Sequence, residues 1–171
     1  PVVHRLGLYE VKKEMEDKMM IHEHPAEYND IKNKIKVSSV EQEKLIENFL
    51  APIRKALENE KIETLIKWRT KSIPSIYEKM KTQNLPFEQI FDIFAVRIII
   101  KNSKLSEEKT DCWRVYSLVT NIYQPNPKRL RDWITTPKVS GYESLHTTVR
   151  ADKNWIEVQI RTERMDEVAE K

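Results

Sequence analysis

The segment Phe91–Ile100, FDIFAVRIII, constrains the fold most, because it is the strongest strand signal in the chain. β-Branched and aromatic residues dominate it and polar residues flank it, as is typical of a buried strand. Arg97 interrupts the apolar run, and a buried arginine needs either a charged partner or an opening to water. The segment therefore predicts a core strand that carries one cation.

Two further strands are predicted within Lys128–Thr162, after a run of cations and a loop around Gly141. Successive side chains point to opposite faces of a strand, so Tyr142, Ser144 and His146 are expected to share one face. Tyr142 directly follows the glycine, and its ring can serve as a stacking platform for a purine. The alternative is a tyrosine that packs the sheet edge, and for His146 a purely structural role.

The second of these strands alternates strictly between apolar and polar residues. Its apolar face holds Ile156, Val158 and Ile160, and its polar face holds Glu157, Gln159 and Arg161. A carboxylate inside a strand is unfavourable unless it faces solvent or a ligand. Glu157 and Asp92, from two strands, could together hold Mg²⁺ on oxygen ligands. The alternative is an ordinary solvated strand face.

Two groups of cations accompany these strands. The first, Arg69, Lys71 and Lys79, contains Ser75, which lies one helical turn before Lys79. Such a group could hold the phosphates of a nucleotide, with an arginine stacked on its base. The alternative is a set of solvent-exposed cations at the start of a helix, without a ligand. The second group, Lys128, Arg129, Arg131 and Lys138, surrounds the predicted loop. Together they favour binding of a highly charged phosphate ester.

The remaining elements predict one mixed domain with a helical first third. Helices are expected over residues 8–20, 28–35, 40–60, 75–81, 107–123 and 163–171, a strand over 62–69 and a loop over 124–128. This order favours an α/β or α+β sheet with mixed strand directions. The main domain is expected to begin near residue 37, which leaves residues 1–36 as a separate helical piece.

Composition excludes several classes of protein. A net charge of +3, from 30 basic and 27 acidic residues, does not indicate a general nucleic-acid binder. Two glycines are too few for a P-loop or a dinucleotide-binding fingerprint. No apolar run approaches the ~20 residues that span a bilayer. The single Cys112 cannot form an internal disulfide, so we expect a cytoplasmic protein.

Three motifs also carry a family resemblance. RLRDWI at residues 129–134, PKVSGYESLHTTV at 137–149 and EVQIRT at 157–162 resemble, in this order, the synthetase domain of the RelA/SpoT family, the (p)ppGpp synthetases. The resemblance implies a nucleotidyltransferase-like mixed β-sheet flanked by helices, formed by residues 37–171. Residues 1–36 are similar to the last helices of the hydrolase domain that precedes the synthetase in long family members.

The resemblance also implies roles for individual residues. It implies ATP binding by Arg69, Lys71, Ser75, Lys79 and Arg97, with Arg97 beside the adenine and opposite Arg69. It implies GDP or GTP binding by Arg131, Lys138, Tyr142, His146 and Gln159, with the guanine stacked on Tyr142. Asp92 and Glu157 would hold Mg²⁺ and act as the catalytic pair, with Glu157 as a metal ligand or as the base.

The activity implied is transfer of pyrophosphate from ATP to the ribose 3′-hydroxyl of GDP or GTP, which gives ppGpp or pppGpp. The hydrolase metal motif is absent, so hydrolysis of the product is not expected. Expected partners are further domains of a longer protein and, through them, the ribosome; neither a membrane nor direct nucleic-acid binding is expected. The alternatives are a nucleotidyltransferase that acts on RNA ends and a non-catalytic guanine-nucleotide-binding or interaction module.

Overall fold

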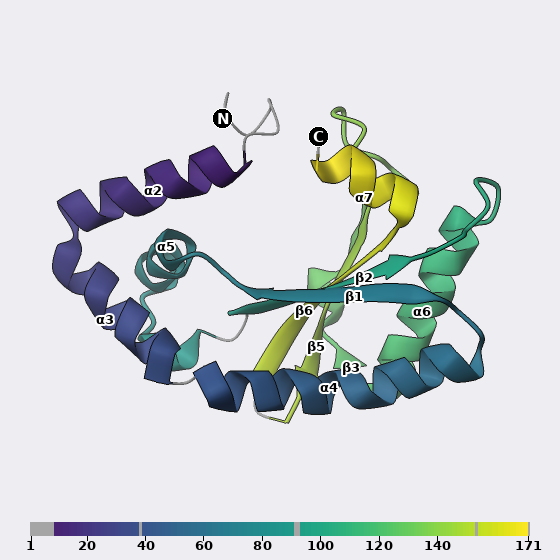
Figure 1. Cartoon of the computed structure of the whole chain (residues 1–171), viewed down its shortest axis with the longest axis horizontal. Helices are drawn as coiled ribbons and strands as arrows, with labels where there is room; N and C mark the ends of the chain where they lie inside the picture. The colour runs from purple at the N-terminus through teal and green to yellow at the C-terminus, as the bar shows by residue number, and fades with distance from the viewer. Residues whose placement is uncertain (1–8, 38, 91–92, 153, 171) are drawn as a thin grey trace.

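The computed structural model describes residues 9–37, 39–90, 93–152 and 154–170 (Figure 1). The helices are α2 (Tyr9–Glu23), α3 (Pro25–Val37), α4 (Ser39–Asn59), α5 (Ile73–Gln83), α6 (Glu108–Ile122) and α7 (Glu163–Glu170), with short 3-10 turns η1 (Phe87–Gln89) and η2 (Pro127–Arg129). The strands are β1 (Thr64–Thr70), β2 (Phe94–Ile100), β3 (Gln124–Pro125), β4 (Arg131–Asp132), β5 (Leu145–Ala151) and β6 (Asn154–Thr162).

The described strands form one mixed sheet in the order β1-β2-β6-β5-β3, and β4 also pairs with β5. Strands β2 and β6 are parallel, whereas β1 with β2, β5 with β6, and β3 and β4 with β5 are antiparallel. The predicted α+β class with mixed strand directions is therefore confirmed. The apolar run after residue 93 forms β2, between β1 and β6.

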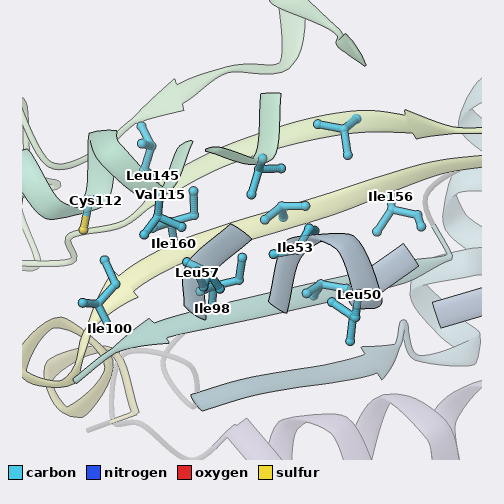
Figure 2. Close-up of a cluster of buried hydrophobic side chains, with 14 of the residues drawn as sticks. Leu50, Ile53, Leu57, Ile98, Ile100, Cys112, Val115, Leu145, Ile156 and Ile160 are labelled. Carbon is cyan, nitrogen blue, oxygen red and sulfur yellow. The ribbon is translucent and has the colours of Figure 1, made fainter. Parts of the chain in front are cut away.

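Helices α4 and α6 cover one face of this sheet (Figure 1). Figure 2 shows Leu50, Ile53 and Leu57 of α4 directed at the strands, where they meet residues such as Ile98 and Ile160. The predicted apolar face of β6 is fully buried in this core, and each such side chain contributes about 1.5–3 kcal/mol when it leaves water. The opposite face of the sheet is consequently the one left for polar side chains.

A smaller apolar cluster joins the N-terminal helices to α5. Met20 of α2 and Ile31 of α3 pack with Ile76 of α5 and with Phe87. These contacts hold α5 against α2 and α3, next to the end of β1 (Figure 1). The predicted domain boundary near residue 37, between the N-terminal helical piece and the main domain, stays a prediction.

Two local predictions differ from the structure. Residues 124–128 were expected to be a loop, but Gln124 and Pro125 form an edge strand opposite Arg150 and Val149, followed by the turn η2. An edge strand tolerates proline because one of its sides needs no N–H donor. The strand expected to include Tyr142 begins only at residue 145.

No helix in the described part of the chain is both long enough and apolar enough to cross a bilayer.

A buried ionic network fixes the beginning of α7 to the beginning of α6. Glu108 is 4% exposed; it accepts from Thr162 Oγ1 at 2.6 Å and from Arg164 Nη2 at 2.6 Å and Nε at 2.8 Å. Arg164 Nη1 also pairs with Glu143 at 2.8 Å, in the loop before β5. The network therefore fixes three segments at once.

Replacing Glu108 with glutamine should lower the free energy of unfolding by about 1.5–3 kcal/mol, the usual contribution of a hydrogen bond to a charged group. Its neighbour Glu107 pairs with Lys104 at 3.6 Å and has a side chain 55% exposed. Glu107→Gln is thus a matched control that should change stability by less than about 0.5 kcal/mol. Urea denaturation measures the free energy of unfolding of both variants. Equal losses in the two would show that the buried network stabilises the fold no more than an exposed ion pair does.

Candidate active site

Polar side chains gather on the sheet face opposite α4 and α6. Strand register aligns one row of them across five strands: Lys67, Arg97, Gln159, His146 and Arg131. A second row, two residues away along the strands, holds Arg69, Ala95, Glu157 and Thr148. Neighbouring strands lie ~4.8 Å apart, so residues distant in the sequence become close neighbours. Helices α5 and α7 flank this face (Figure 1).

Glu157 lies near the middle of this face. Its side chain is 21% exposed, Oε2 accepts from Lys71 Nζ at 3.4 Å, and Oε1 accepts from Gln159 Nε2 at 2.8 Å. Burial alone would raise the pKa of this carboxyl, but the Lys71 charge and the Gln159 hydrogen bond outweigh it, and the pKa lies below its ordinary value. Glu157 is therefore an anion at neutral pH.

A group of cations lies on the α5 side of Glu157. Lys71 follows β1, and its N–H donates to the carbonyl of Ile93 at 2.8 Å, which joins this segment to the start of β2. Burial, together with the charges of Lys71 and Arg129, lowers the pKa of Lys79 to about 8, although the charge of Glu157 opposes this shift. Lys71, Lys79 and Arg129 therefore form a cluster of positive charge, and such a cluster favours the binding of an anionic ligand.

The other residues of this group are placed by β1 and α5. Arg69 is exposed on the polar face of β1, in register with Ala95. Helix α5 begins at Ile73, and Pro74 and Ser75 both lie in its first turn. The Ser75 hydroxyl forms a hydrogen bond with the Ser72 hydroxyl at 2.7 Å. The predicted group Arg69, Lys71, Ser75 and Lys79 thus comes together at one edge of the polar face.

A second group lies on the β5 side of Glu157. The Tyr142 hydroxyl accepts from Arg161 Nη2 at 2.6 Å and lies 2.9 Å from His146 Nε2. Burial lowers the pKa of His146 to about 4, aided by Arg161 and other cations and opposed by Glu157. The imidazole is therefore neutral at pH 7, and in the tautomer with its proton on Nδ1 the Nε2 atom can accept a hydrogen bond from the Tyr142 hydroxyl.

Lys138 reaches the ring of the same tyrosine. Its Nζ lies 5.0 Å from the Tyr142 ring centre and 4.7 Å from that of Trp133, within cation–π distance. The turn is closed by Gly141, whose φ of +79° suits glycine. Arg131 lies on β4 and is in register with His146 on β5; its Nη1 donates to the carbonyls of Lys128 and Leu130 at 3.0 Å.

Arg97 has the charged partners that its place in an apolar strand demands. Its Nη1 donates to Asp166 Oδ1 at 3.1 Å and to Glu170 Oε1 at 2.7 Å, both on α7. Its Nε also donates to Gln159 Oε1 at 3.4 Å. Arg97 lies two residues beyond Ala95, on the same face as Arg69.

The polar face of β6 is not the solvated surface that we weighed as an alternative: Gln159 is 8% exposed and Arg161 is 3% exposed. Sequence reasoning missed Arg161 and Asp166 as members of the site. A cation on the same strand face as Glu157 was the available signal for Arg161. Asp92, the predicted second metal ligand, lies outside the described residues.

Comparisons with known proteins identify the relatives of the chain. A sequence model described as "Region found in RelA / SpoT proteins" matches residues 68–171. A guanosine-3′,5′-bis(diphosphate) 3′-pyrophosphohydrolase from Borreliella burgdorferi is 39% identical over 99% of this chain. The bifunctional (p)ppGpp synthase/hydrolase SpoT from Escherichia coli is 36% identical over 99% of this chain. The chain spans about a quarter of each of these relatives, 25% and 24%.

Among solved structures, small alarmone synthetase 2 from Bacillus subtilis superposes with a TM-score of 0.55 at 31% sequence identity. The match covers 80% of this chain and 74% of that protein.

Proposed function

Because the chain belongs to the RelA/SpoT family, we propose that it acts in (p)ppGpp metabolism, as a pyrophosphokinase that transfers pyrophosphate from ATP to GDP or GTP. The observation that carries this proposal is the position of Glu157, an anion with Lys71 and Lys79 on one side and His146 on the other. A reaction between two nucleotides needs a binding group for each and a charged centre between them.

Two comparisons of chain length support synthesis rather than hydrolysis. The relative named as a pyrophosphohydrolase and the bifunctional SpoT, whose names include hydrolysis, are each about four times longer than the segment that matches them. The structural relative named as a synthetase is matched over 74% of its own length. We therefore assign the synthetase part to this chain, with the N-terminal helices α2 and α3 as the end of a preceding domain.

We assign the cations next to α5 to the triphosphate of ATP. Lys71 and Lys79 would neutralise its oxygens, with the Ser75 hydroxyl as a donor near the start of the helix. Arg69 and Arg97 occupy diagonal positions on paired strands, which are roughly 7–8 Å apart. From these positions on one face, both long side chains could reach a flat adenine ring, so we assign the adenine to this pair.

We assign the group next to β5 to the acceptor nucleotide. Tyr142 would stack on the guanine, while Lys138 and Arg131 supply charge for its phosphates. His146 is neutral, so it would act as a hydrogen-bonding group rather than as a cation. Gln159 connects the two groups, because its Oε1 accepts from Arg97 on the ATP side and from Arg161, which contacts Tyr142.

The donor chemistry at Glu157 fits Mg²⁺. An ionised, partly exposed carboxylate is the oxygen ligand that this ion prefers, and Asp92 would supply the second carboxylate. Within the ranges that the structure describes, no cluster of three or more histidine, cysteine or acidic side chains offers a competing site. When bound, Mg²⁺ would neutralise charge on the phosphate oxygens.

In the proposed reaction the ribose 3′-oxygen of GDP or GTP attacks the β-phosphorus of ATP. A bond forms between that oxygen and the phosphorus, the bond from the β-phosphorus to the α–β bridging oxygen breaks, and AMP leaves with the bridging oxygen. The 3′-hydroxyl proton passes to solvent water. A general base works best with a pKa near 7, and the pKa of Glu157 is lowered, so we infer an electrostatic and metal-binding role for it.

The proposal is tested by incubating the chain with ATP, GDP and Mg²⁺ and identifying the products by ion-exchange chromatography and mass spectrometry. We expect guanosine tetraphosphate and AMP in equal amounts, and neither when EDTA removes the metal. A parallel incubation with ppGpp alone should release no pyrophosphate. Binding of GDP without any product would contradict the proposal in favour of a non-catalytic nucleotide-binding module.

Replacing Lys79 with methionine should raise the KM for ATP about tenfold or more, because a hydrogen bond to a charged group is lost. The same change should raise the Tm of the nucleotide-free protein at pH 7, since it removes a partly buried cation that two other cations repel. The folded pKa of about 8 lies below the ordinary 10.5, so wild-type stability should rise between these pH values and the Tm difference should shrink.

The control is Lys81→Met, because Lys81 is an exposed residue on the same helix. This variant should have a KM for ATP within twofold of the wild-type value. An unchanged KM in Lys79→Met would remove Lys79 from the ATP group. A lower Tm at pH 7 would show that its proton is favourable in the folded state.

A further inference from the structure

Arg161 of β6 is a buried arginine with acceptors on all of its sides. It is 3% exposed, its Nε donates to Ser144 Oγ at 3.2 Å, and Nη1 donates to Asp166 Oδ1 at 3.1 Å. Its Nη2 donates to the Tyr142 hydroxyl at 2.6 Å and to Gln159 Oε1 at 3.4 Å. A planar guanidinium held by this many acceptors has one orientation, so it is a rigid element of the site.

This arginine holds Tyr142 in two ways. Besides the hydrogen bond to the hydroxyl, its guanidinium carbon lies 4.9 Å from the ring centre. The hydroxyl is bound at the same time to His146 Nε2. Because Tyr142 lies before the first residue of β5, strand pairing does not fix its ring. Side-chain contacts do so instead, and Arg161 contacts both the hydroxyl and the ring.

Asp166 connects Arg161 to the other side of the site. Its Oδ1 accepts from Arg161 Nη1 and from Arg97 Nη1, each at 3.1 Å, and its side chain is 13% exposed. One carboxylate oxygen therefore joins a residue that holds Tyr142 to an arginine of the ATP group. Because Arg97 and Arg161 share this acceptor, a displacement of one arginine changes the hydrogen bonding of the carboxylate to the other.

We propose that Arg161 is a positioning residue for the acceptor nucleotide, which fixes the Tyr142 ring for stacking, and that Asp166 links this unit to Arg97 on the ATP side. The inference rests on the proposed function, because it takes Tyr142 as the residue that stacks on the guanine. Arg161 itself does not touch the nucleotide; its effect passes through Tyr142.

The test compares Arg161→Lys, Tyr142→Phe and the double variant, with Arg150→Lys, an exposed arginine on β5, as the control. Lysine keeps the charge but loses the planar set of donors. We expect Arg161→Lys to raise the Kd of GDP, by calorimetry, and the KM for GDP by about tenfold. The control should change neither. The double variant should bind GDP no more weakly than Arg161→Lys alone, because both changes interrupt the same contact.

Two results would overturn the inference. An unchanged Kd of GDP in Arg161→Lys would show that the arginine does not position the acceptor. Effects of Arg161→Lys and Tyr142→Phe that multiply in the double variant would show that Arg161 does not act through Tyr142.

Should Arg161→Lys fail to fold, Asp166→Asn tests the same unit without removing the arginine. It should raise the KM, or in binding assays the Kd, for GDP and for ATP, each at least threefold, because the lost carboxylate serves arginines of both groups. A change for only one nucleotide, or for neither, would contradict the link between the two sides.

Failure of this inference can be distinguished from failure of the proposed function. A wild-type chain that makes tetraphosphate while Arg161→Lys retains full GDP affinity contradicts the inference alone. A wild-type chain that binds GDP but makes no product contradicts the proposed function, and the binding comparison still decides the role of Arg161. A wild-type chain that does not bind GDP contradicts both.

Discussion

Replacing Glu157 with glutamine is expected to lower the rate of tetraphosphate formation by about 10²–10⁴-fold, the range found when one charged catalytic group is lost. Glutamine keeps the shape of the side chain and an oxygen that can still accept from Gln159. It removes the negative charge that faces Lys71 at 3.4 Å and that would hold the metal ion. The loss should therefore appear in kcat more than in the KM for either nucleotide.

The fold should survive this change, because Glu157 belongs to the polar face and not to the core beneath α4. We expect the Tm of Glu157→Gln to stay within a few degrees of wild type. Glu47→Gln, at an exposed ion pair on α4, is the matched control and should retain full activity. Turnover of Glu157→Gln at more than one tenth of the wild-type rate would remove Glu157 from the catalytic centre.

Replacing Tyr142 with alanine is expected to raise the KM for GDP by roughly 5- to 150-fold, which corresponds to about 1–3 kcal/mol for one aromatic ring stacked on a base. The ring also carries the hydroxyl that Arg161 and His146 share, so alanine removes both the platform and the contact that orients it. The KM for ATP should change much less, because Tyr142 contacts His146, Arg161 and Lys138 on the β5 side of Glu157.

Steady-state kinetics with each nucleotide varied in turn measures this prediction. Tyr142→Phe keeps the ring and should have the smaller effect of the two variants. Equal effects of alanine and phenylalanine would mean that the hydroxyl matters and stacking does not. A KM for GDP that alanine leaves unchanged would place the guanine elsewhere.

Strand alternation made much of this site predictable from sequence. The pattern of β6 assigned Ile156 to the core and Glu157 to the other face, and the structure confirms both assignments. The arginine inside β2 predicted a charged partner, and Asp166 and Glu170 provide one. Such predictions succeed because the two faces of a half-buried strand impose opposite demands on the same chain.

What the sequence could not predict is which distant residues meet. Arg97 required an acid, but the chain has 27 acidic residues, and only strand order and the position of α7 select Asp166, 69 residues away. The role of Arg161 was missed for the same reason, since its partners come from three segments. The edge strand β3 was missed because two residues with a proline carry no periodic signal.

The central claim is transfer of an intact pyrophosphate group between two nucleotides on the polar face around Glu157. The most direct test incubates the chain with GDP, Mg²⁺ and ATP labelled in either the α- or the γ-phosphate. The account predicts that the γ-label moves to the guanine nucleotide while the α-label remains in AMP. Appearance of the α-label in the guanine nucleotide, with release of free pyrophosphate, would contradict it and indicate nucleotidyl transfer instead.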